Sequence, residues 1–394
     1  MEGPLTSTPP ATTSYSLCPS AATLYLLPSV YTFLFLTALP GNALSLWVFL
    51  RRIPTISPIH IYLSHLSASN LLLSLTAPFL AGYYARGSVW APGDALCQTV
   101  LHGVTPVLHI NLYISMLILT WVALSRFAAL IRNTHAPRPS ACATLLPRGF
   151  FTRLTRASFA NTVCASMWLV SVGGVVPATV YYSVMEAAGA GPAGGCVEVC
   201  SSPAVELGGR QTATVAVPVI TLFFLFYLLV LLSYVTVLRH LRRSRRNTTV
   251  STSQSLLTKV FRNIVVILVV ISVCLLPYHI FKPIFITLAH DEAGLPHSAA
   301  PDFCTCHPLS ALIEIKNCLL LLATLRSSTD PVMYFLLDGT FRTHALRLLS
   351  CKQEPSRFQT TFWSLTGSFN PRSEEQREAN VSTVDVDATH GNVS

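Results

Sequence analysis

Seven long apolar segments constrain the fold of this chain more than any other feature of its sequence. A helix needs about 20 apolar residues to cross the hydrocarbon of a bilayer. Five segments reach that length without any Asp, Glu, Lys or Arg: residues 21–50, 59–85, 95–125, 157–185 and 211–238. The sixth, 263–289, contains only Lys282, and the seventh, 309–337, contains Glu314, Lys316, Arg326 and Asp330. The sequence therefore predicts an all-α membrane protein built as a seven-transmembrane helix bundle.

The placement of charge supports this fold and orients it. Only 11% of the residues are charged, against about 25% in soluble proteins. Most of the 26 Lys and Arg residues follow the first, third, fifth and seventh apolar runs. Since basic loops stay on the cytoplasmic side of a membrane, we expect an extracellular amino terminus and a cytosolic tail, in the plasma membrane. The same distribution argues against nucleic acid as a partner, despite the net charge of +9.

The chain divides into four parts around the bundle. We expect an extracellular segment at 1–20, the bundle at 21–338, a short interfacial eighth helix at 339–351 and a disordered cytoplasmic tail at 352–394. Apolar residues share one face of the eighth helix beside basic ones, as in helices that lie on membrane lipids. Cys351 at its end is a candidate palmitoylation site. Ser and Thr residues of the tail are candidate phosphorylation sites for arrestin recruitment.

Short motifs at matched places in several helices make the prediction more specific. They are Gly41-Asn42, Ser125-Arg126-Phe127, Trp168, Cys274-Leu-Leu-Pro277-Tyr and Asp330-Pro331-Val-Met-Tyr334. This set resembles the rhodopsin-like G-protein-coupled receptors, and Asp-Pro in the last helix resembles their purinergic-type branch. The resemblance implies a receptor that transmits an extracellular signal to a heterotrimeric G protein.

The resemblance also suggests which residues switch the receptor. Arg126 matches the arginine that couples to the G protein, but Ser125 stands where the family usually has an acid that restrains it. We therefore expect raised basal activity. Pro277 should kink the sixth helix, since proline lacks a backbone donor, although Leu275 replaces a common aromatic switch residue. Tyr234 and Tyr334 match tyrosines that stabilise the open state.

A polar site is expected in the middle of the membrane. Asn70 stands where the family usually has a sodium-binding aspartate. Arg326 lies one turn before Asp330, so the two side chains share one helix face. Because an unpaired charge in hydrocarbon is costly, we expect an Arg326–Asp330 ion pair in place of sodium. Asn70 should hydrogen-bond the pair, Asn42 should belong to the same site, and signalling should not respond specifically to sodium.

The outer half of the bundle contains the candidate ligand site. Lys282 and Lys316 match basic positions that bind anionic ligands, such as nucleotides or lipid phosphates, in purinergic-type receptors. His279 matches a pocket position, and His109 and Tyr113 lie one turn apart on the third helix. Lysine suits phosphate or carboxylate. The alternative is that Lys316 pairs locally with Glu314 while Lys282 extends to the membrane surface.

Two disulfides are expected outside the cell, where they persist. The resemblance implies a bridge from Cys97 to the second outer loop, with Cys200 favoured over Cys196. Cys18 is expected to pair with Cys306 or Cys304, which would tie the amino-terminal segment to the third outer loop.

Other functions fit the sequence less well. A constitutively active, ligand-independent or decoy receptor is the main alternative, because Ser125, Leu275 and Asn70 depart from the family pattern. A transporter is expected to contain inverted repeats with broken helices, and no such repeat is present. Neither a GxSxG pattern nor a zinc-type cysteine arrangement occurs. We therefore expect no enzymatic activity, cofactor or metal.

Overall fold

The protein is described by a computed structural model. It describes residues 15–16, 18–53, 57–87, 95, 99–133, 148–178, 180–181, 184, 210–246, 251–292 and 305–349. Residues Met1–Ala345 form one compact unit. Cys97, Cys196, Cys200, Cys304 and Cys351 lie outside the described residues, so the Cys97 bridge and the palmitoylation site remain predictions.

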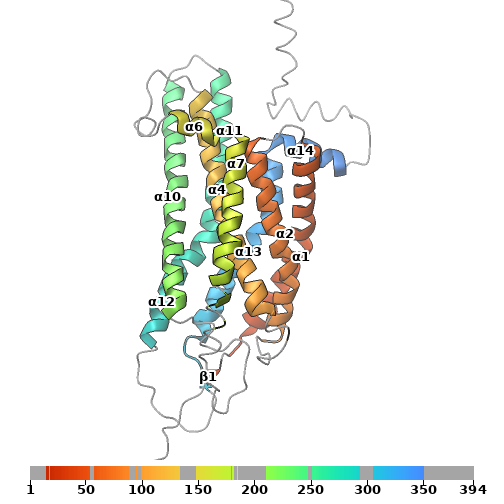
Figure 1. The fold of residues 1–394 in the computed structure, drawn as a ribbon, viewed down its shortest axis with the longest axis vertical. Helices are drawn as coiled ribbons and strands as arrows, with labels where there is room; N and C mark the ends of the chain where they lie inside the picture. Colours follow the sequence, from red (N-terminus) through yellow and green to blue (C-terminus); the bar gives the residue numbers. More distant parts are fainter. Residues whose placement is uncertain are drawn as a thin grey trace, which may run out of the picture. The chain divides into compact units, whose positions relative to one another are not determined.

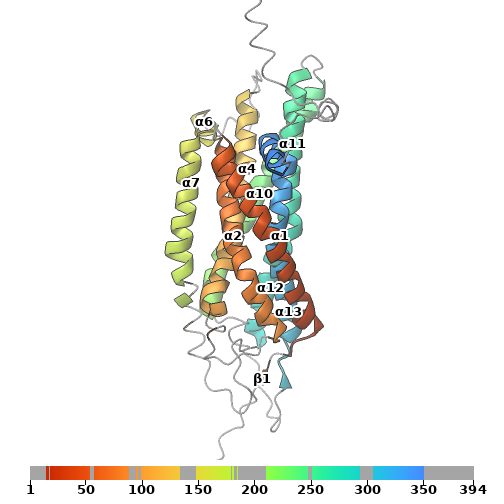
Figure 2. The same ribbon diagram turned by 90° about the vertical axis from the view of Figure 1, so that its right-hand side faces the viewer.

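Long helices dominate this unit (Figures 1 and 2). The helices are α1 (Leu27–Trp47), α2 (Pro58–Ala85), α4 (Thr105–Asn133), α6 (Arg148–Leu154), α7 (Ala157–Val170), α10 (Arg210–Arg246), α11 (Ser251–Val270), α12 (Leu276–Glu292), α13 (Ser310–Leu337) and α14 (Gly339–Leu349). π-Helical turns extend or join several of them, at Ala22–Leu26, Val48–Arg52, Val100–Val104, Ser171–Val175 and Ile271–Leu275. Two short strands, β1 (Tyr15–Ser16) and β2 (Thr305–Cys306), pair in parallel.

Five of the described helical segments are long and apolar enough to cross a membrane: Ala22–Arg52, His102–Ala129, Ala157–Ala178, Ala216–Arg239 and Thr258–Ala289. The helices α2 and α13 have 28 residues each, about 42 Å at 1.5 Å per residue. These two helices are more polar than the five apolar segments because they contain Ser, Asn, Arg and Asp residues. Those polar side chains are buried in the bundle interior. Both pack against α1. The predicted all-α membrane fold is confirmed.

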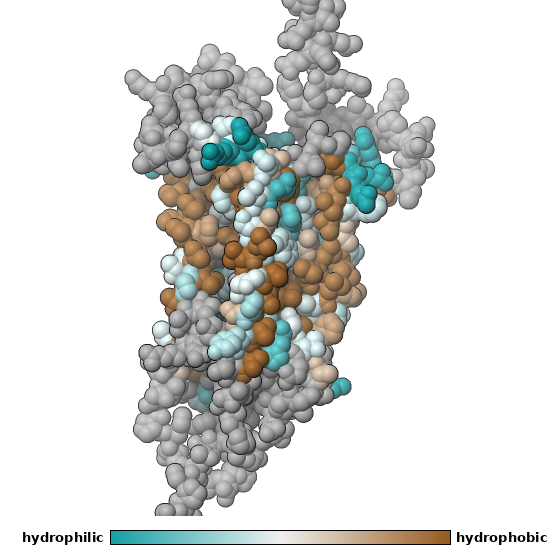
Figure 3. All heavy atoms as spheres, in the orientation of Figure 1, coloured by the Kyte–Doolittle hydropathy of each residue, from teal (hydrophilic) through white to brown (hydrophobic). Residues whose placement is uncertain are grey.

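The outer surface of the bundle is apolar. Leu36, Leu169 and Val170 are 64%, 74% and 67% exposed. Figure 3 shows hydrophobic residues over the middle of the described helices and hydrophilic residues gathered at one end. Large contiguous apolar surfaces are rare on proteins that face water. We therefore infer that lipid surrounds this surface.

The two ends of the bundle differ in content. One end contains α6, the start of α14 and the Arg51–Arg52 pair, and is termed the basic end (Figure 1). The opposite end contains the β1–β2 pair and is termed the disulfide end, because Cys18 and Cys306 form a disulfide there. The structure thus selects Cys306 over Cys304 as the partner of Cys18.

Pro277 follows an irregular turn, as expected for a helix hinge. The α-helical pattern of α11 is interrupted at Ile271–Leu275 by a π-helical turn, and α12 resumes one residue before Pro277. The proline nitrogen has no hydrogen to donate to the preceding turn. Insertions of this kind are a common cause of bends in long helices.

Candidate functional site

An ion pair lies in the interior of the bundle. Arg326 and Asp330 on α13 are 1% and 0% exposed, and their side chains are paired. Asn70 on α2 donates from Nδ2 to Asp330 Oδ2 at 2.8 Å. Its Oδ1 accepts from Arg326 Nη2 at 3.2 Å. The ion pair and its contact with Asn70 are those that the sequence predicts.

Two residues of α4 complete the shell around the guanidinium. Arg326 Nη2 donates to Ser115 Oγ, and to Asn111 Oδ1 at 3.4 Å. Asn111 Nδ2 in turn donates to Asn70 Oδ1 at 3.1 Å and to Ser69 Oγ at 3.0 Å. Asn111 and Ser115 were not among the predicted site residues. Their spacing of four residues places both polar side chains on one face of α4, which is the pattern that could have indicated them.

Asn42 connects this network to α1. Its Nδ2 donates to the Ala38 and Ser327 carbonyls, each at 2.8 Å. Its Oδ1 accepts from Asn70 Nδ2 at 3.0 Å. The network therefore links α1, α2, α4 and α13 through buried polar groups. Because the guanidinium supplies one positive charge beside one carboxylate, the pair is neutral as a whole.

The predicted ligand-site residues form a histidine–aromatic cluster toward the disulfide end. The Tyr113 ring lies between His109 and His279, with ring centroids 6.4 Å and 6.5 Å away. The His279 ring stacks on Phe223 at 3.7 Å. Its Nδ1 is 2.8 Å from the Leu275 carbonyl, so Nδ1 carries the proton. Nε2 is then an acceptor, and it has no partner among the described residues.

The two lysines lie over aromatic rings at this cluster. Lys282 Nζ is 5.4 Å from the Tyr278 ring centroid, and Lys316 Nζ is 5.2 Å from that of Phe285. Such cation–π contacts contribute about 0.5–1 kcal/mol at exposed sites. The charges of both lysines act on His109. The structure thus brings the five candidate ligand residues into one region of the bundle.

Glu314 has partners other than the local lysine considered in the sequence analysis. Its Oε1 accepts from the backbone nitrogens of Ser20 and Thr23, each at 3.1 Å, and from both hydroxyl groups. One carboxylate oxygen therefore holds the start of the first membrane helix against α13. The disulfide between Cys18 and Cys306 lies next to this contact in the chain.

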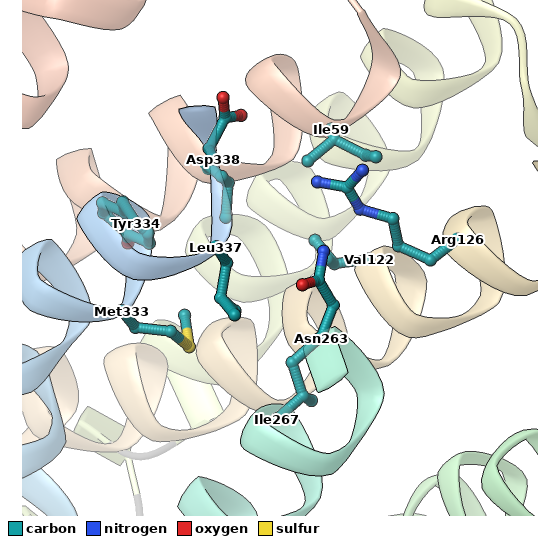
Figure 4. Close-up of a pocket in the computed structure, with 10 residues that line it drawn as sticks. Ile59, Val122, Arg126, Asn263, Ile267, Met333, Tyr334, Leu337 and Asp338 are labelled. Carbon is teal, nitrogen blue, oxygen red and sulfur yellow. The ribbon is translucent and has the colours of Figure 1, made fainter. Parts of the chain in front are cut away.

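Arg126 lies at the basic end, in a small cavity between α2, α4, α11 and α13 (Figure 4). The lining residues are Ile59, Leu63, Val122, Arg126, Asn263, Ile267, Met333, Tyr334, Leu337 and Asp338. The cavity has a volume of about 20 Å³, room for about one water molecule. The cavity is therefore too small to admit a protein segment.

The two candidate switch tyrosines pack in separate places. Tyr234 on α10 stacks on Phe261 of α11 at 5.5 Å. Tyr334 on α13 lines the Arg126 cavity and contacts the rings of Phe49 and Phe341 at 5.6 Å and 6.0 Å. Each tyrosine thus joins helices that bound the basic end, but only Tyr334 lies beside Arg126.

Within the described residues, no group of three or more His, Cys, Asp and Glu side chains is arranged to hold a metal ion. The Arg326 network, the histidine–aromatic cluster and the Arg126 cavity offer hydrogen bonding and ion pairing. The geometry consists of a histidine–aromatic cluster with two lysines toward one end, a buried polar network in the middle and a cation at the other end. This arrangement is that of a membrane receptor.

The chain belongs to the rhodopsin family of seven-transmembrane receptors, because the model of that family, "7 transmembrane receptor (rhodopsin family)", matches residues 41–334. It is 36% identical over 341 residues to probable G-protein coupled receptor 82 of Mus musculus, covering 86% of this chain and 99% of that protein. The Homo sapiens protein of the same name is 35% identical, covering 82% and 92%. A purinoceptor of Homo sapiens is 28% identical, covering 79% and 73%. The predicted similarity to the purinergic-type branch is thus confirmed.

Proposed function

We propose that this protein is a plasma-membrane receptor that transmits an extracellular signal to a heterotrimeric G protein. The amino terminus and the disulfide end face outward, and the arginine-rich basic end faces the cytosol, in accord with the positive-inside rule. Arrestin and membrane lipids are further partners of the cytosolic tail and α14. Palmitoylation of Cys351 would anchor the end of that helix.

One observation carries this proposal: the partly buried Arg126 lines a small cavity bounded by four membrane helices at the basic end. A partner reaches Arg126 only after these helices separate. The polar network around Arg326 joins three of the four helices by hydrogen bonds. A ligand that shifts the outer half of α13 or α12 therefore acts on helices that close the cavity.

The experiment is a panel of G-protein activation assays on the expressed full chain without ligand and with acidic ligand libraries. We expect a receptor-dependent signal in at least one G-protein class. The Arg126→Met variant should reduce this signal about tenfold or more, since it removes the cation from the cavity at the basic end, termed the coupling cavity. If no class responds to any condition while the protein is at the cell surface, the G-protein proposal is wrong.

A constitutively active or decoy receptor is the second candidate. Ser125 favours it, because its hydroxyl donates to the Leu154 carbonyl at 3.4 Å instead of restraining Arg126 with charge. A strong signal without ligand would identify the constitutive form. Ligand binding without a signal in any class would identify a decoy.

We infer that the ligand is anionic. Lys282 and Lys316 place two cations beside His109 and His279, and one relative at 27% identity is named uracil nucleotide/cysteinyl leukotriene receptor. A phosphate or carboxylate would replace the weak ring contacts of the lysines by charge-assisted hydrogen bonds.

Replacing Lys282 with alanine is expected to weaken an acidic agonist by about tenfold or more, the worth of one charge-assisted hydrogen bond. Lys282→Arg should retain most of the affinity. The measurement is a concentration–response curve with nucleoside triphosphates and lysophosphatidic acid as probes. Lys259→Ala, at an exposed site on the cytosolic part of α11, is the matched control. Equal potency of an acidic probe on all four proteins would contradict an anion site at Lys282.

A further inference from the structure

Arg126 requires a negative charge that its own helix does not supply. Its Nε is buried and has no partner among the described residues. The preceding residue, Ser125, is neutral and donates to the Leu154 carbonyl. The Arg126 side chain is partly removed from water, and a partly buried charge is stabilised by an opposite charge nearby. Since α4 contains no acidic residue, a counter-charge for Arg126 can come only from another part of the bundle.

Asp338 is the acid in the right place. It lies between α13 and α14, is 7% exposed and lines the same cavity as Arg126 (Figure 4). The other described acidic residues of the bundle lie elsewhere. Asp330 is paired with Arg326, Glu314 holds the amino-terminal segment, and Asp291 and Glu292 end α12 at the other end of the bundle.

The remaining contacts of Asp338 hold it at the start of α14 and against His60. Its Oδ1 accepts from the backbone nitrogens of Thr340 and Phe341 at 2.9 Å and 3.1 Å, and so caps the start of α14. Its Oδ2 lies 3.0 Å from His60 Nε2. His60 Nδ1 is buried without a partner among the described residues.

The carboxyl group of Asp338 is ionised at cytosolic pH. Burial by itself raises its pKa, but the hydrogen bond and the charge of His60, the Phe341 backbone donor and the charge of Arg126 outweigh burial and hold the pKa below its usual value. The negative charge on the α13–α14 junction is therefore permanent. Asp338 and Arg126 are the two charged residues that line this cavity.

We propose that Asp338 is the counter-charge that restrains Arg126 in the closed receptor, and that His60 positions Asp338 for this role. The attraction links α4 to the end of α13 across the coupling cavity. Opening the cavity separates the two charges. This inference rests on the proposed function, whose regulation it specifies.

The substitution Asp338→Asn tests the charge while retaining the helix cap, because asparagine caps helices as well as aspartate does. We expect basal G-protein activation to rise about fivefold or more at matched surface expression, as the closed state loses its restraint. His60→Leu should raise it in the same direction, since Asp338 loses the hydrogen bond that positions it. Unchanged basal activity in Asp338→Asn, in a receptor that signals, overturns the proposal.

A second measurement needs no G protein. Thermal unfolding of the purified full chain is recorded for Arg126→Met, Asp338→Asn and the double variant. We expect the double variant to be less destabilised than the sum of the single effects, as for residues that interact. Arg126→Met combined with Glu314→Gln, at opposite ends of the bundle, is the additive control. Additivity of the Arg126 and Asp338 effects overturns the proposal even if the receptor activates no G protein.

Discussion

Replacing Arg326 with leucine is expected to destabilise the bundle more than any other single change considered for its interior. The substitution leaves the fully buried Asp330 carboxylate without its counter-charge. It also leaves Asn70, Asn111 and Ser115 without the donor that they share. Breaking a buried pair by removing one member costs about 3–5 kcal/mol. The measurements are surface expression and the midpoint of thermal unfolding.

The double variant Arg326→Leu with Asp330→Asn is the matched control. It removes both charges, and asparagine at 330 still accepts from Asn70. We expect it to recover much of the lost stability, because no isolated charge remains in the bundle. A double variant as unstable as Arg326→Leu alone would show that the ion pair is not the source of the effect.

The second large effect is expected at the disulfide end. Cys18 and Cys306 are separated by 288 positions in the chain. Removing a native disulfide costs about 2–5 kcal/mol in small secreted domains. The Cys18→Ser variant should therefore lower the unfolding midpoint, and mild reduction of the unchanged protein should have the same effect. Both are measured on purified protein in detergent.

Glu314 provides the comparison for this prediction. The Glu314→Ala variant removes the acceptor of the Ser20 and Thr23 donors but keeps the disulfide. We expect it to destabilise the same end by a smaller amount, because these groups are partly open to water. Since both contacts hold one segment, Cys18→Ser and Glu314→Ala should be non-additive. Wild-type stability of Cys18→Ser would contradict a structural role for the bridge.

Much of the core site was predictable because it is local in sequence. Arg326 and Asp330 are four residues apart on one helix, so helix geometry alone places their side chains together. The same rule bears on the alternative of a Glu314–Lys316 pair. The two residues are two positions apart, a spacing at which helical side chains do not face each other, and Glu314 accepts hydrogen bonds from Ser20 and Thr23.

Contacts between distant segments were not predictable in the same way. The roles of Asn111 and Ser115 depend on how α4 rotates toward α13. The Asp338 contact with His60 joins positions 278 residues apart. The sequence left open whether Cys18 pairs with Cys306 or Cys304, and the structure pairs it with Cys306. Each of these outcomes follows from helix packing, which no short motif encodes.

By itself, the sequence determined the membrane helices and the family, and it predicted how the helices are oriented in the membrane. Hydrophobic length, the placement of basic residues and short motifs are properties of contiguous segments. Only the tertiary structure decided that the Arg326 cation is enclosed by three helices and that Asp338 and Arg126 line the same cavity. The physical reason is that a buried charge is stabilised by whichever groups packing brings within a few ångströms, and these come from anywhere in the chain.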